Sequence, residues 1–285
     1  MKLLTYRRDG AVRHGHLISD TIHELGEGDL ADLIAEVGDF TGWTPPPSTA
    51  TYPLADVDVL PPLSRPGKLL AVAANYQDHI AEGGGDPLNK ARLAPRLFLK
   101  PPTTLAAPVA EIELPSISAQ VDWEAELAVI VGRGGKDIDV ADALTHVAGY
   151  AVANDVSARS VEYGYERDSA PVVGFFDWLA GKWPDGFCPF GPWLVTASEV
   201  PDPQDLAVEL DVNGVTRQSG NTADMIFDVA ELVSFASRLM TLEPGDVLLT
   251  GTPAGTGAAT GEFLRRGDEM TVRITGLGEL VNRVV

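Results

Sequence analysis

Two glutamates separated by one residue, Glu124 and Glu126, open an apolar, β-branched run that ends at Val131. Such a run predicts a strand, in which residues i and i+2 point to the same face. Two carboxylates on one face of a core strand repel each other, so such pairs commonly share a proton or bind a cation. The alternative interpretation is a solvated strand end with two surface acids.

A third acidic residue, Asp155, follows Asn154 at the end of another apolar run, where a turn would also suit an Asn-Asp pair. With the two glutamates it would complete a set of three oxygen ligands. Carboxylates without clustered cysteine or histidine favour Mg²⁺ or Mn²⁺, with Ca²⁺ possible in their place, over zinc. Three protein ligands also leave about three octahedral positions for water and substrate, as a catalytic metal requires.

His79 and Glu82 are three residues apart, the spacing at which side chains meet on a helical turn. A carboxylate beside an imidazole fixes its tautomer and raises its basicity, which suits a general base. The three glycines at 83–85 favour a hinge, so the segment is a candidate lid. An exposed helix pair without a catalytic role is the alternative.

The glycine-rich loop 250–257 lacks the Gly-Lys-Ser/Thr ending of a phosphate loop, which argues against nucleotide binding. Its backbone amides are suited to a carboxylate, although an ordinary loop fits the same pattern. Lys182 lies in a segment with Phe175, Phe176 and Trp178. A lysine in such surroundings is more often a surface residue, with its stem on apolar groups, than a catalytic cation.

The elements that must position these residues are mainly strands. Alternation predicts strands within 1–26, around a turn at Asp9-Gly10, and at 68–74, 111–114, 124–131, 206–212, 247–250 and 270–274. Helices are predicted at 29–37 and, as the longest, at 227–240. The proline-dense stretch 45–66 predicts a connector. We therefore expect a mainly β, α+β protein with a small N-terminal domain and connector over 1–66 and a catalytic domain over 67–285.

Composition narrows the possible partners. A chain of 285 residues, 45% of them hydrophobic, can bury a full core. Its net charge of −20 argues against nucleic acid and anionic membranes. The single cysteine, Cys188, excludes an internal disulfide and a multi-cysteine zinc site. With no apolar run of about 18 residues and no charged-then-apolar leader, we expect neither a membrane span nor an export signal, and a cytoplasmic location.

Several motifs occur in order along the second part of the chain. They are Asn-Tyr-x-x-His-x-x-Glu from residue 75, Phe-Leu-Lys-Pro from 98, Glu-x-Glu-Leu-Ala from 124, Gly-Tyr-x-x-x-Asn-Asp-Val-Ser-Ala-Arg from 149, Lys182, Gly-Pro-Trp from 191, Asn-Gly from 213, Asn-Thr-x-x-Met-Ile-Phe from 221, Leu-Glu-Pro-Gly-Asp from 242 and Thr-Gly-Thr-Pro from 250. Together they resemble the fumarylacetoacetate hydrolase family over roughly residues 68–285, including its acylpyruvases and 2-hydroxyhepta-2,4-diene-1,7-dioate isomerases.

The resemblance implies a mixed β-roll or β-sandwich core, a small N-terminal α+β domain, a homodimer and a role in aromatic catabolism. It implies Mg²⁺ or Mn²⁺ held by Glu124, Glu126 and Asp155. Three further residues match catalytic positions, namely a water-activating dyad on a lid and a lysine that polarises the substrate: His79, Glu82 and Lys182. Three more match substrate-binding positions, and the last of them lies in the loop that receives the substrate carboxylate: Lys100, Arg159 and Thr252.

The chain departs from the family pattern in two places. Members that act on acylpyruvates often read Ala-Arg-Asp-x-Gln, whereas Glu162 stands here in place of the glutamine and cannot donate at neutral pH. The segment 163–181 is also longer than expected and rich in Phe and Trp. We expect both features near the pocket, where they would influence the choice of substrate.

The main hypothesis is hydrolysis of a C–C bond in a small anionic 1,3-dioxo acid, of the acylpyruvate or fumarylpyruvate type. His79 would activate water, and the metal and Lys182 would stabilise the enolate that leaves. One alternative is decarboxylation of a β-keto acid or isomerisation of a dienoic oxo-diacid at the same site. Another is a non-catalytic protein whose acidic cluster holds a structural metal ion.

Overall fold

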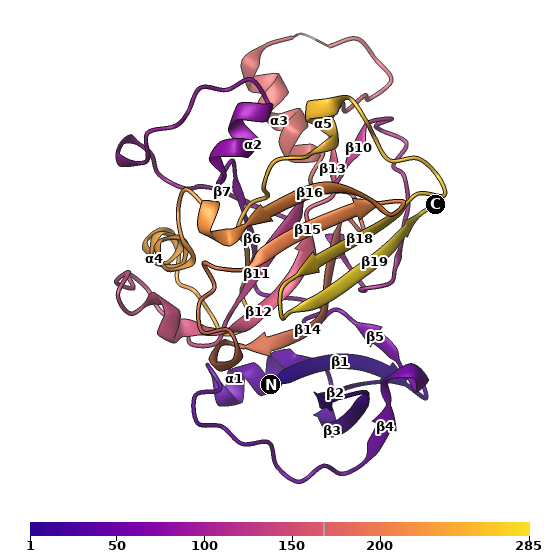
Figure 1. Cartoon of the computed structure of the whole chain (residues 1–285), viewed down its shortest axis with the longest axis vertical. Helices are drawn as coiled ribbons and strands as arrows, with labels where there is room; N and C mark the ends of the chain where they lie inside the picture. The colour runs from indigo at the N-terminus through magenta and orange to yellow at the C-terminus, as the bar shows by residue number, and fades with distance from the viewer. Residues whose placement is uncertain (168) are drawn as a thin grey trace.

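The computed structural model describes residues 1–167 and 169–285, and within these ranges the strands form three sheets, of twelve, five and two strands (Figure 1). Along the largest sheet the order is β4 (Thr51–Pro53), β3 (Thr21–Glu27), β2 (Ala11–Ile18), β1 (Lys2–Arg8), β14 (Cys188–Thr196), β12 (Val147–Asn154), β11 (Ala125–Val131), β17 (Val247–Leu249), β6 (Leu69–Ala73) and β7 (Arg96–Leu99). Beside this path, β5 (Asp58–Leu60) pairs with β1 and β8 (Leu105–Ala106) with β14.

The other sheets and the helices complete the β-rich α+β fold that the sequence predicts. The five-stranded sheet runs β16 (Val215–Asn221), β15 (Ala207–Val212), β18 (Glu269–Ile274), β19 (Gly278–Val284) and β9 (Glu111–Ile112), and the two-stranded one pairs β10 (Val121–Asp122) with β13 (Ser157–Ala158). The α-helices are α1 (Leu30–Val37), α2 (Gln77–Glu82), α3 (Pro171–Ala180), α4 (Val229–Leu239) and α5 (Gly257–Thr260).

Local sequence signals explain several elements. Asp9 and Gly10 both adopt positive φ, as the predicted hairpin turn between β1 and β2 requires. α4 is the longest α-helix among the described residues, as predicted, and begins with a capping box between Asp228 and Glu231. α3 escaped prediction because its sequence is apolar on nearly all sides, which leaves no periodic pattern to detect.

The central strand β11 is buried on both faces. Leu127 and Val129 pack toward the five-stranded sheet, in the same core as Leu210 of β15. Ile130 packs on the opposite side, in a core shared with Ile34 of α1. Two packed layers therefore enclose the strand, which explains its continuous apolar sequence.

The N-terminal strands join the large sheet. β1 pairs with β14 through Lys2 and Leu3, so the sheet continues across the predicted domain boundary. The proline-dense connector contributes two three-residue strands, β4 and β5, to the rim of this sheet. Pro53 ends β4, which is a terminal strand of the sheet. Proline is tolerated at such an edge because its missing N–H removes no hydrogen bond between central strands. The boundary between 1–66 and 67–285 stays a prediction.

Strand directions bring the chemistry to one edge of the large sheet. β11 begins where its antiparallel neighbour β12 ends, with Ala125 paired to Asn154. β17 also runs antiparallel to β11, and β6 runs parallel to β17, so both end at that same edge. The segments that follow β6, β12 and β17 therefore meet there, and Figure 1 shows α2, α3 and α5 gathered at this end of the molecule.

Candidate active site

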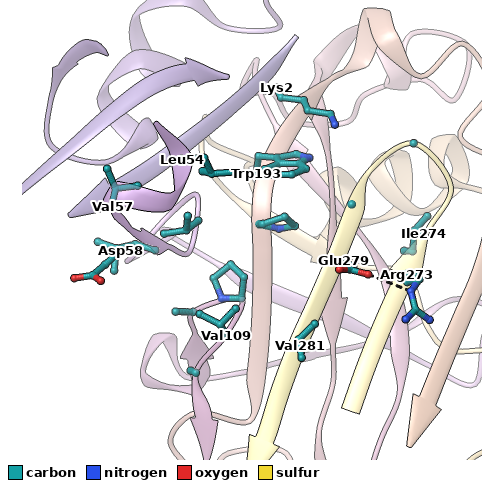
Figure 2. Close-up of a pocket in the computed structure, with 18 of the residues that line it drawn as sticks. Lys2, Leu54, Val57, Asp58, Val109, Trp193, Arg273, Ile274, Glu279 and Val281 are labelled. Atoms are coloured by element: carbon teal, nitrogen blue, oxygen red, sulfur yellow. Dashed lines mark hydrogen bonds and ion pairs between the residues drawn. The ribbon is translucent and has the colours of Figure 1, made fainter. Parts of the chain in front are cut away.

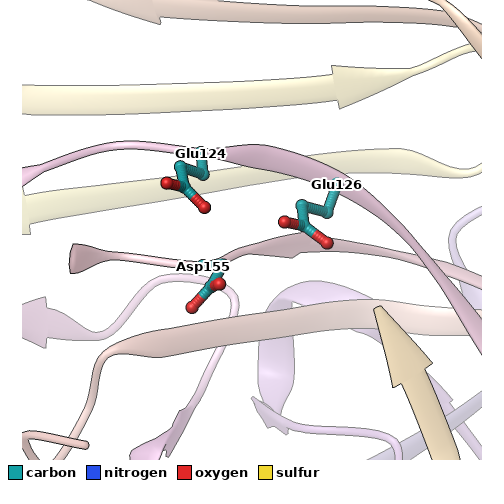
Figure 3. A group of neighbouring side chains, drawn as sticks. All are labelled: Glu124, Glu126 and Asp155. Atoms are coloured by element: carbon teal, nitrogen blue, oxygen red, sulfur yellow. The ribbon is translucent and has the colours of Figure 1, made fainter. Parts of the chain in front are cut away.

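The carboxylates of Glu124, Glu126 and Asp155 meet at this edge. Each offers an oxygen, and the three oxygens all lie within 4.8 Å of one another. Figure 3 shows the side chains facing a shared space, and all three residues are at least 95% buried. Backbone pairing sets the arrangement, because Asp155 N–H donates to the carbonyl of Glu124 at 2.8 Å and Glu124 N–H donates to Oδ1 of Asn154 at 3.0 Å.

Three cationic side chains surround the carboxylates. Lys182 Nζ donates to Glu124 Oε2 at 2.6 Å and to Asp155 Oδ2 at 2.7 Å. Lys100 Nζ reaches Asp155 Oδ1 at 2.5 Å and also donates to the carbonyl of Lys182 at 2.7 Å. Arg159 Nη2 contacts Glu124 Oε1 at 2.5 Å. Lys182 is itself buried, and therefore is not the surface lysine that the alternative interpretation of its segment describes.

The carboxylates differ in their electrostatic environment. Burial alone would raise the pKa of Glu124, but the charges of Lys182 and Arg159 outweigh it and hold that pKa well below its usual range. Glu126 behaves in the opposite way. Burial, then the charges of Asp155 and Glu124, raises the pKa of Glu126 well above its ordinary value. Positive charge therefore compensates Glu126 less than it compensates Glu124. The Glu126 carboxylate accepts a hydrogen bond from Gly251 N–H at 2.7 Å.

The donor set fits a hard divalent cation. It consists of carboxylate oxygens from three residues, close enough together to share one ion. When all groups are ionised, four carboxylates and three cationic side chains give the cluster a formal charge of −1, from Asp122, Glu124, Glu126, Asp155, Lys100, Arg159 and Lys182. A divalent cation would change this to +1 and make the site attractive to an anionic substrate.

The predicted pair on α2 is also formed. His79 Nδ1 and Glu82 Oε1 lie 2.7 Å apart. Glu82 further accepts from Gly255 N–H at 2.6 Å and from the Thr256 hydroxyl at 2.9 Å, so α2 is attached to the glycine-rich loop after β17. The imidazole lines the same cavity as the acidic cluster.

That cavity has a volume of about 310 Å³, and it collects most of the residues singled out by the sequence. Its polar lining includes His79, Arg96, Glu124, Glu126, Arg159, Lys182 and Thr252, and its apolar lining includes Val72, Phe98, Phe175 and Trp178. Lys100 is not part of this lining but bonds Asp155 of the acidic cluster. Glu162 is exposed and lines a different hollow, which shares α3 with this cavity, and its influence on the choice of substrate stays a prediction.

Two supporting residues were missed by sequence reasoning. Asp122 is fully buried and accepts hydrogen bonds from Arg159 Nε at 2.8 Å, Gly257 N–H at 2.6 Å and Ala258 N–H at 3.0 Å. It joins Arg159 to the start of α5. An aspartate two residues before the Glu-x-Glu motif was the only signal available.

The second supporting residue is Gln218 on β16. Its Nε2 donates to the Thr252 hydroxyl and to the carbonyl of Pro253, both at 2.8 Å, and its Oε1 accepts from Ala125 N–H at 2.9 Å. The Thr252 hydroxyl donates in turn to the carbonyl of Ala125 at 2.9 Å. The hydroxyl is thus used within the fold, and no local sequence pattern marks Gln218.

A larger cavity, of about 940 Å³, lies elsewhere, between the N-terminal strands and the β18–β19 hairpin (Figure 2). Its lining includes Leu54, Val57, Trp193, Ile274 and Val281, with an Arg273–Glu279 ion pair at one side. Size alone does not identify the reactive site. Glu124, Glu126, His79 and the buried Lys182 all line the smaller cavity.

Comparison with known proteins agrees with this fold and site. The family model described as fumarylacetoacetate (FAA) hydrolase C-terminal matches residues 68–285, and the chain therefore belongs to the fumarylacetoacetate hydrolase family. It is 43% identical to the human mitochondrial oxaloacetate tautomerase FAHD2A over 235 residues, which cover 82% of this chain and 71% of that protein.

Solved structures agree along the whole length. A fumarylacetoacetate hydrolase from the psychrophile Exiguobacterium antarcticum superposes with a TM-score of 0.82 at 36% identity, covering 100% of this chain and 99% of that one. A 2-hydroxyhepta-2,4-diene-1,7-dioate isomerase from Mycobacterium marinum gives 0.77 at 33% identity, covering 100% and 98%. These relatives include a hydrolase, an isomerase and a tautomerase.

Within the described ranges, no helix has both the length and the apolar character needed to cross a membrane.

Proposed function

We propose that the protein is a divalent-metal-dependent hydrolase that cleaves a C–C bond in a small anionic 1,3-dioxo acid of the acylpyruvate or fumarylpyruvate type. The main supporting observation is the 2.7 Å contact of Glu82 with His79, which lines the same cavity as Glu124, Glu126 and Lys182. A histidine oriented by a carboxylate, beside a cluster that a bound divalent cation would make electropositive, suits attack by water on a carbonyl.

In this proposal Glu124, Glu126 and Asp155 hold Mg²⁺ or Mn²⁺, with Ca²⁺ as a possible substitute. When bound, the ion would supply Lewis-acid stabilisation of negative charge on the substrate oxygens. Glu82 holds the His79 ring through Nδ1, which directs Nε2 to take a proton from water. The activated water adds to the distal carbonyl, the C–C bond breaks, and Lys182 stabilises the enolate that departs.

The predicted substrate-binding residues divide into two groups. We propose that Arg159 faces the substrate, because it lines the cavity, and that Thr252 contributes through the loop after β17. For Lys100 we propose a positioning role, since its ammonium group already bonds Asp155 and the Lys182 carbonyl. That would replace the direct substrate contact expected from the sequence.

A second reaction at the same site is supported by the relatives. A protein 43% identical to this chain is named an oxaloacetate tautomerase, and solved neighbours include a dienoic diacid isomerase. Decarboxylation of a β-keto acid belongs to the same group of reactions. Tautomerisation and isomerisation need proton transfer at carbon but no attacking water, and His79 could serve as their base.

Product analysis distinguishes these reactions. Purified protein is incubated with acylpyruvates, oxaloacetate and a dienoic oxo-diacid, with Mg²⁺ or Mn²⁺ added, and the products are identified by mass spectrometry. Hydrolysis gives two acid fragments and decarboxylation gives carbon dioxide, whereas isomerisation leaves the mass unchanged and is followed by the change in ultraviolet absorbance. Metal-dependent melting without turnover of any of these compounds would instead indicate a metal-stabilised, non-catalytic protein.

We also propose a homodimer, as the family resemblance implies, in which large apolar side chains that are exposed in one chain become covered. Light scattering coupled to size exclusion, with the chain mass of 30.3 kDa as reference, tests this proposal. A monomer across the micromolar range would exclude it. The cytoplasmic location and the part played in aromatic catabolism stay predictions.

A further inference from the structure

The helix α3 places two aromatic side chains on the wall of the reactive cavity. Phe175 and Trp178 are three residues apart, so they share one face of the helix, and both line the cavity with the acidic cluster. Resting on the proposed function, we propose that this pair selects the substrate by its distal acyl group. The preferred group would be planar and apolar, such as an aryl ring, rather than a short alkyl or carboxylate group.

The aromatic side chains form a continuous wall that begins beside the reactive lysine. Trp178 packs edge-on against Phe98 of β7, with ring centroids 5.0 Å apart, and Phe175 lies 6.0 Å from Trp178. The Nζ atom of Lys182 lies 5.6 Å from the centroid of the Phe98 ring and 5.8 Å from the centroid of the Trp178 ring. A substrate whose oxygens face Lys182 would therefore extend its far end along these rings.

Phe175 has an exposed fraction of 55%, high for a large apolar residue that lines a cavity. A planar apolar group lying against it would remove water from both surfaces, which favours binding. Aromatic rings also attract each other in offset or edge-on contacts, so an aryl group gains more than an alkyl group of similar size. The wall consequently favours substrates by shape and apolar character.

Two contacts hold the C-terminal half of α3 in place. Arg167 forms two hydrogen bonds of 2.8 Å with Asp177 in this half of the helix. Just after the helix, the carbonyl of Gly181 accepts from Ala158 N–H at 2.9 Å. A Cβ on Gly181 would lie 2.0 Å from the Ala158 carbonyl oxygen, so only glycine allows this approach. The same link connects α3 to β13, just after the metal-binding segment.

A competing determinant enters the cavity from β7. Arg96 is exposed, lines the cavity and lies two residues before Phe98, on the same face of the strand. Its guanidinium would favour a substrate that ends in a carboxylate. The proposal therefore predicts that removing the ring of Phe175 changes substrate preference more than removing the charge of Arg96.

The experiment compares three substrates in four proteins. Acetylpyruvate, benzoylpyruvate and fumarylpyruvate are assayed with Mn²⁺ against wild type, Phe175→Ala, Arg96→Ala and the control Phe176→Ala. Phe176 belongs to the same helix and is 58% exposed, but it is not part of the cavity lining. We expect the benzoyl-to-acetyl ratio of kcat/KM to fall at least about 10-fold in Phe175→Ala, mainly through KM, and to stay within about 2-fold in Phe176→Ala.

A binding measurement separates this inference from the proposed reaction. Phenylpyruvate and pyruvate are titrated calorimetrically into the Mn²⁺-loaded protein. Tighter binding of phenylpyruvate, reduced in Phe175→Ala but not in Phe176→Ala, supports the wall even if no acylpyruvate is cleaved. Equal binding of both compounds, equal effects of the two phenylalanine substitutions, or a fumarylpyruvate preference that only Arg96→Ala removes would overturn it.

Discussion

The backbone N–H of Gly255 donates to Oε2 of Glu82 at 2.6 Å, which attaches α2 to the loop after β17. The other oxygen of Glu82 accepts from the Thr256 hydroxyl and contacts His79 Nδ1. One carboxylate thus orients the proposed base and fixes the segment that holds it. The three glycines that follow, at 83–85, suit a hinge about which this attachment could open.

The attachment predicts a pH dependence. Burial would raise the pKa of Glu82, but the hydrogen bonds from His79, Gly255 and Thr256 outweigh it and lower that pKa below its reference value of 4.5. A lowered pKa means that the stabilisation is fully present above the unfolded-state pKa and is lost as pH falls through the folded-state value. The protection of the α2 amides, measured as their exchange rate relative to the intrinsic rate at the same pH, should therefore be lower at about pH 3 than at about pH 7.

Glu82→Gln provides the control for this pH effect. Glutamine keeps the shape but has no charge to lose, so the protection of its α2 amides should already be low at neutral pH and change less on acidification. Equal pH dependence in wild type and in Glu82→Gln would show that another group controls the attachment.

Replacing His79 tests the base directly. Because proton removal by a positioned base contributes roughly 10²–10⁴-fold, His79→Gln should lower kcat for hydrolysis by that factor. The substitution leaves the acidic cluster intact, so Mn²⁺ should still raise the melting temperature as in wild type. An unchanged kcat would exclude His79 as the base.

Substitutions within the acidic cluster should differ in their effect on stability. Asp155→Asn removes the charge that faces two buried ammonium groups, those of Lys100 and Lys182. Lys100 would lose the carboxylate it contacts, and Lys182 would keep Glu124. Removing a partner of buried charges is costly, so we expect the free energy of unfolding to fall by about 3 kcal/mol or more. Glu126→Gln instead removes a charge that its neighbours oppose and keeps the acceptor for Gly251, so the metal-free protein should be at least as stable as wild type.

Both cluster variants should lose metal binding and activity. Stabilisation by a ligand grows with its concentration relative to Kd and reaches about 2.7 kcal/mol at about 100 times Kd. Wild type should therefore show a melting temperature that rises with Mg²⁺ or Mn²⁺ and falls with a chelator, whereas Glu126→Gln should respond to neither. A normal metal response in Glu126→Gln would remove Glu126 from the ligand set.

Asp122 is expected to act through Arg159 and the loop before α5. Asp122→Asn keeps the size of the side chain but weakens its bonds to the Arg159 guanidinium and to two backbone N–H groups. Hydrogen bonds to charged groups contribute about 1.5–3 kcal/mol, so a stability loss in that range is expected. KM should rise more than kcat falls, because Arg159 would lose its orientation toward the substrate. Steady-state kinetics separates the two constants, and a fall in kcat alone would argue against this role.

Much of the site could be predicted because its residues lie in short, ordered motifs. The i, i+2 spacing of Glu124 and Glu126 and the i, i+3 spacing of His79 and Glu82 are local geometry, which follows from strand and helix periodicity. The same reason made three features of the fold predictable: the hairpin turn at Asp9-Gly10, the long helix α4 and the predominance of β-strands. No such pattern marks α3, which is apolar on nearly all sides.

Sequence alone predicted the kind of site, since three carboxylates, an imidazole and a lysine in these motifs indicate a set of oxygen ligands with a base. Tertiary structure decided which groups meet. Antiparallel pairing of β11 with β12 brings Asp155 to Glu124, and the same edge gathers Asp122, Gln218 and the aromatic face of α3. These contacts depend on strand register and on packing between distant segments, which residue types and spacing do not encode locally.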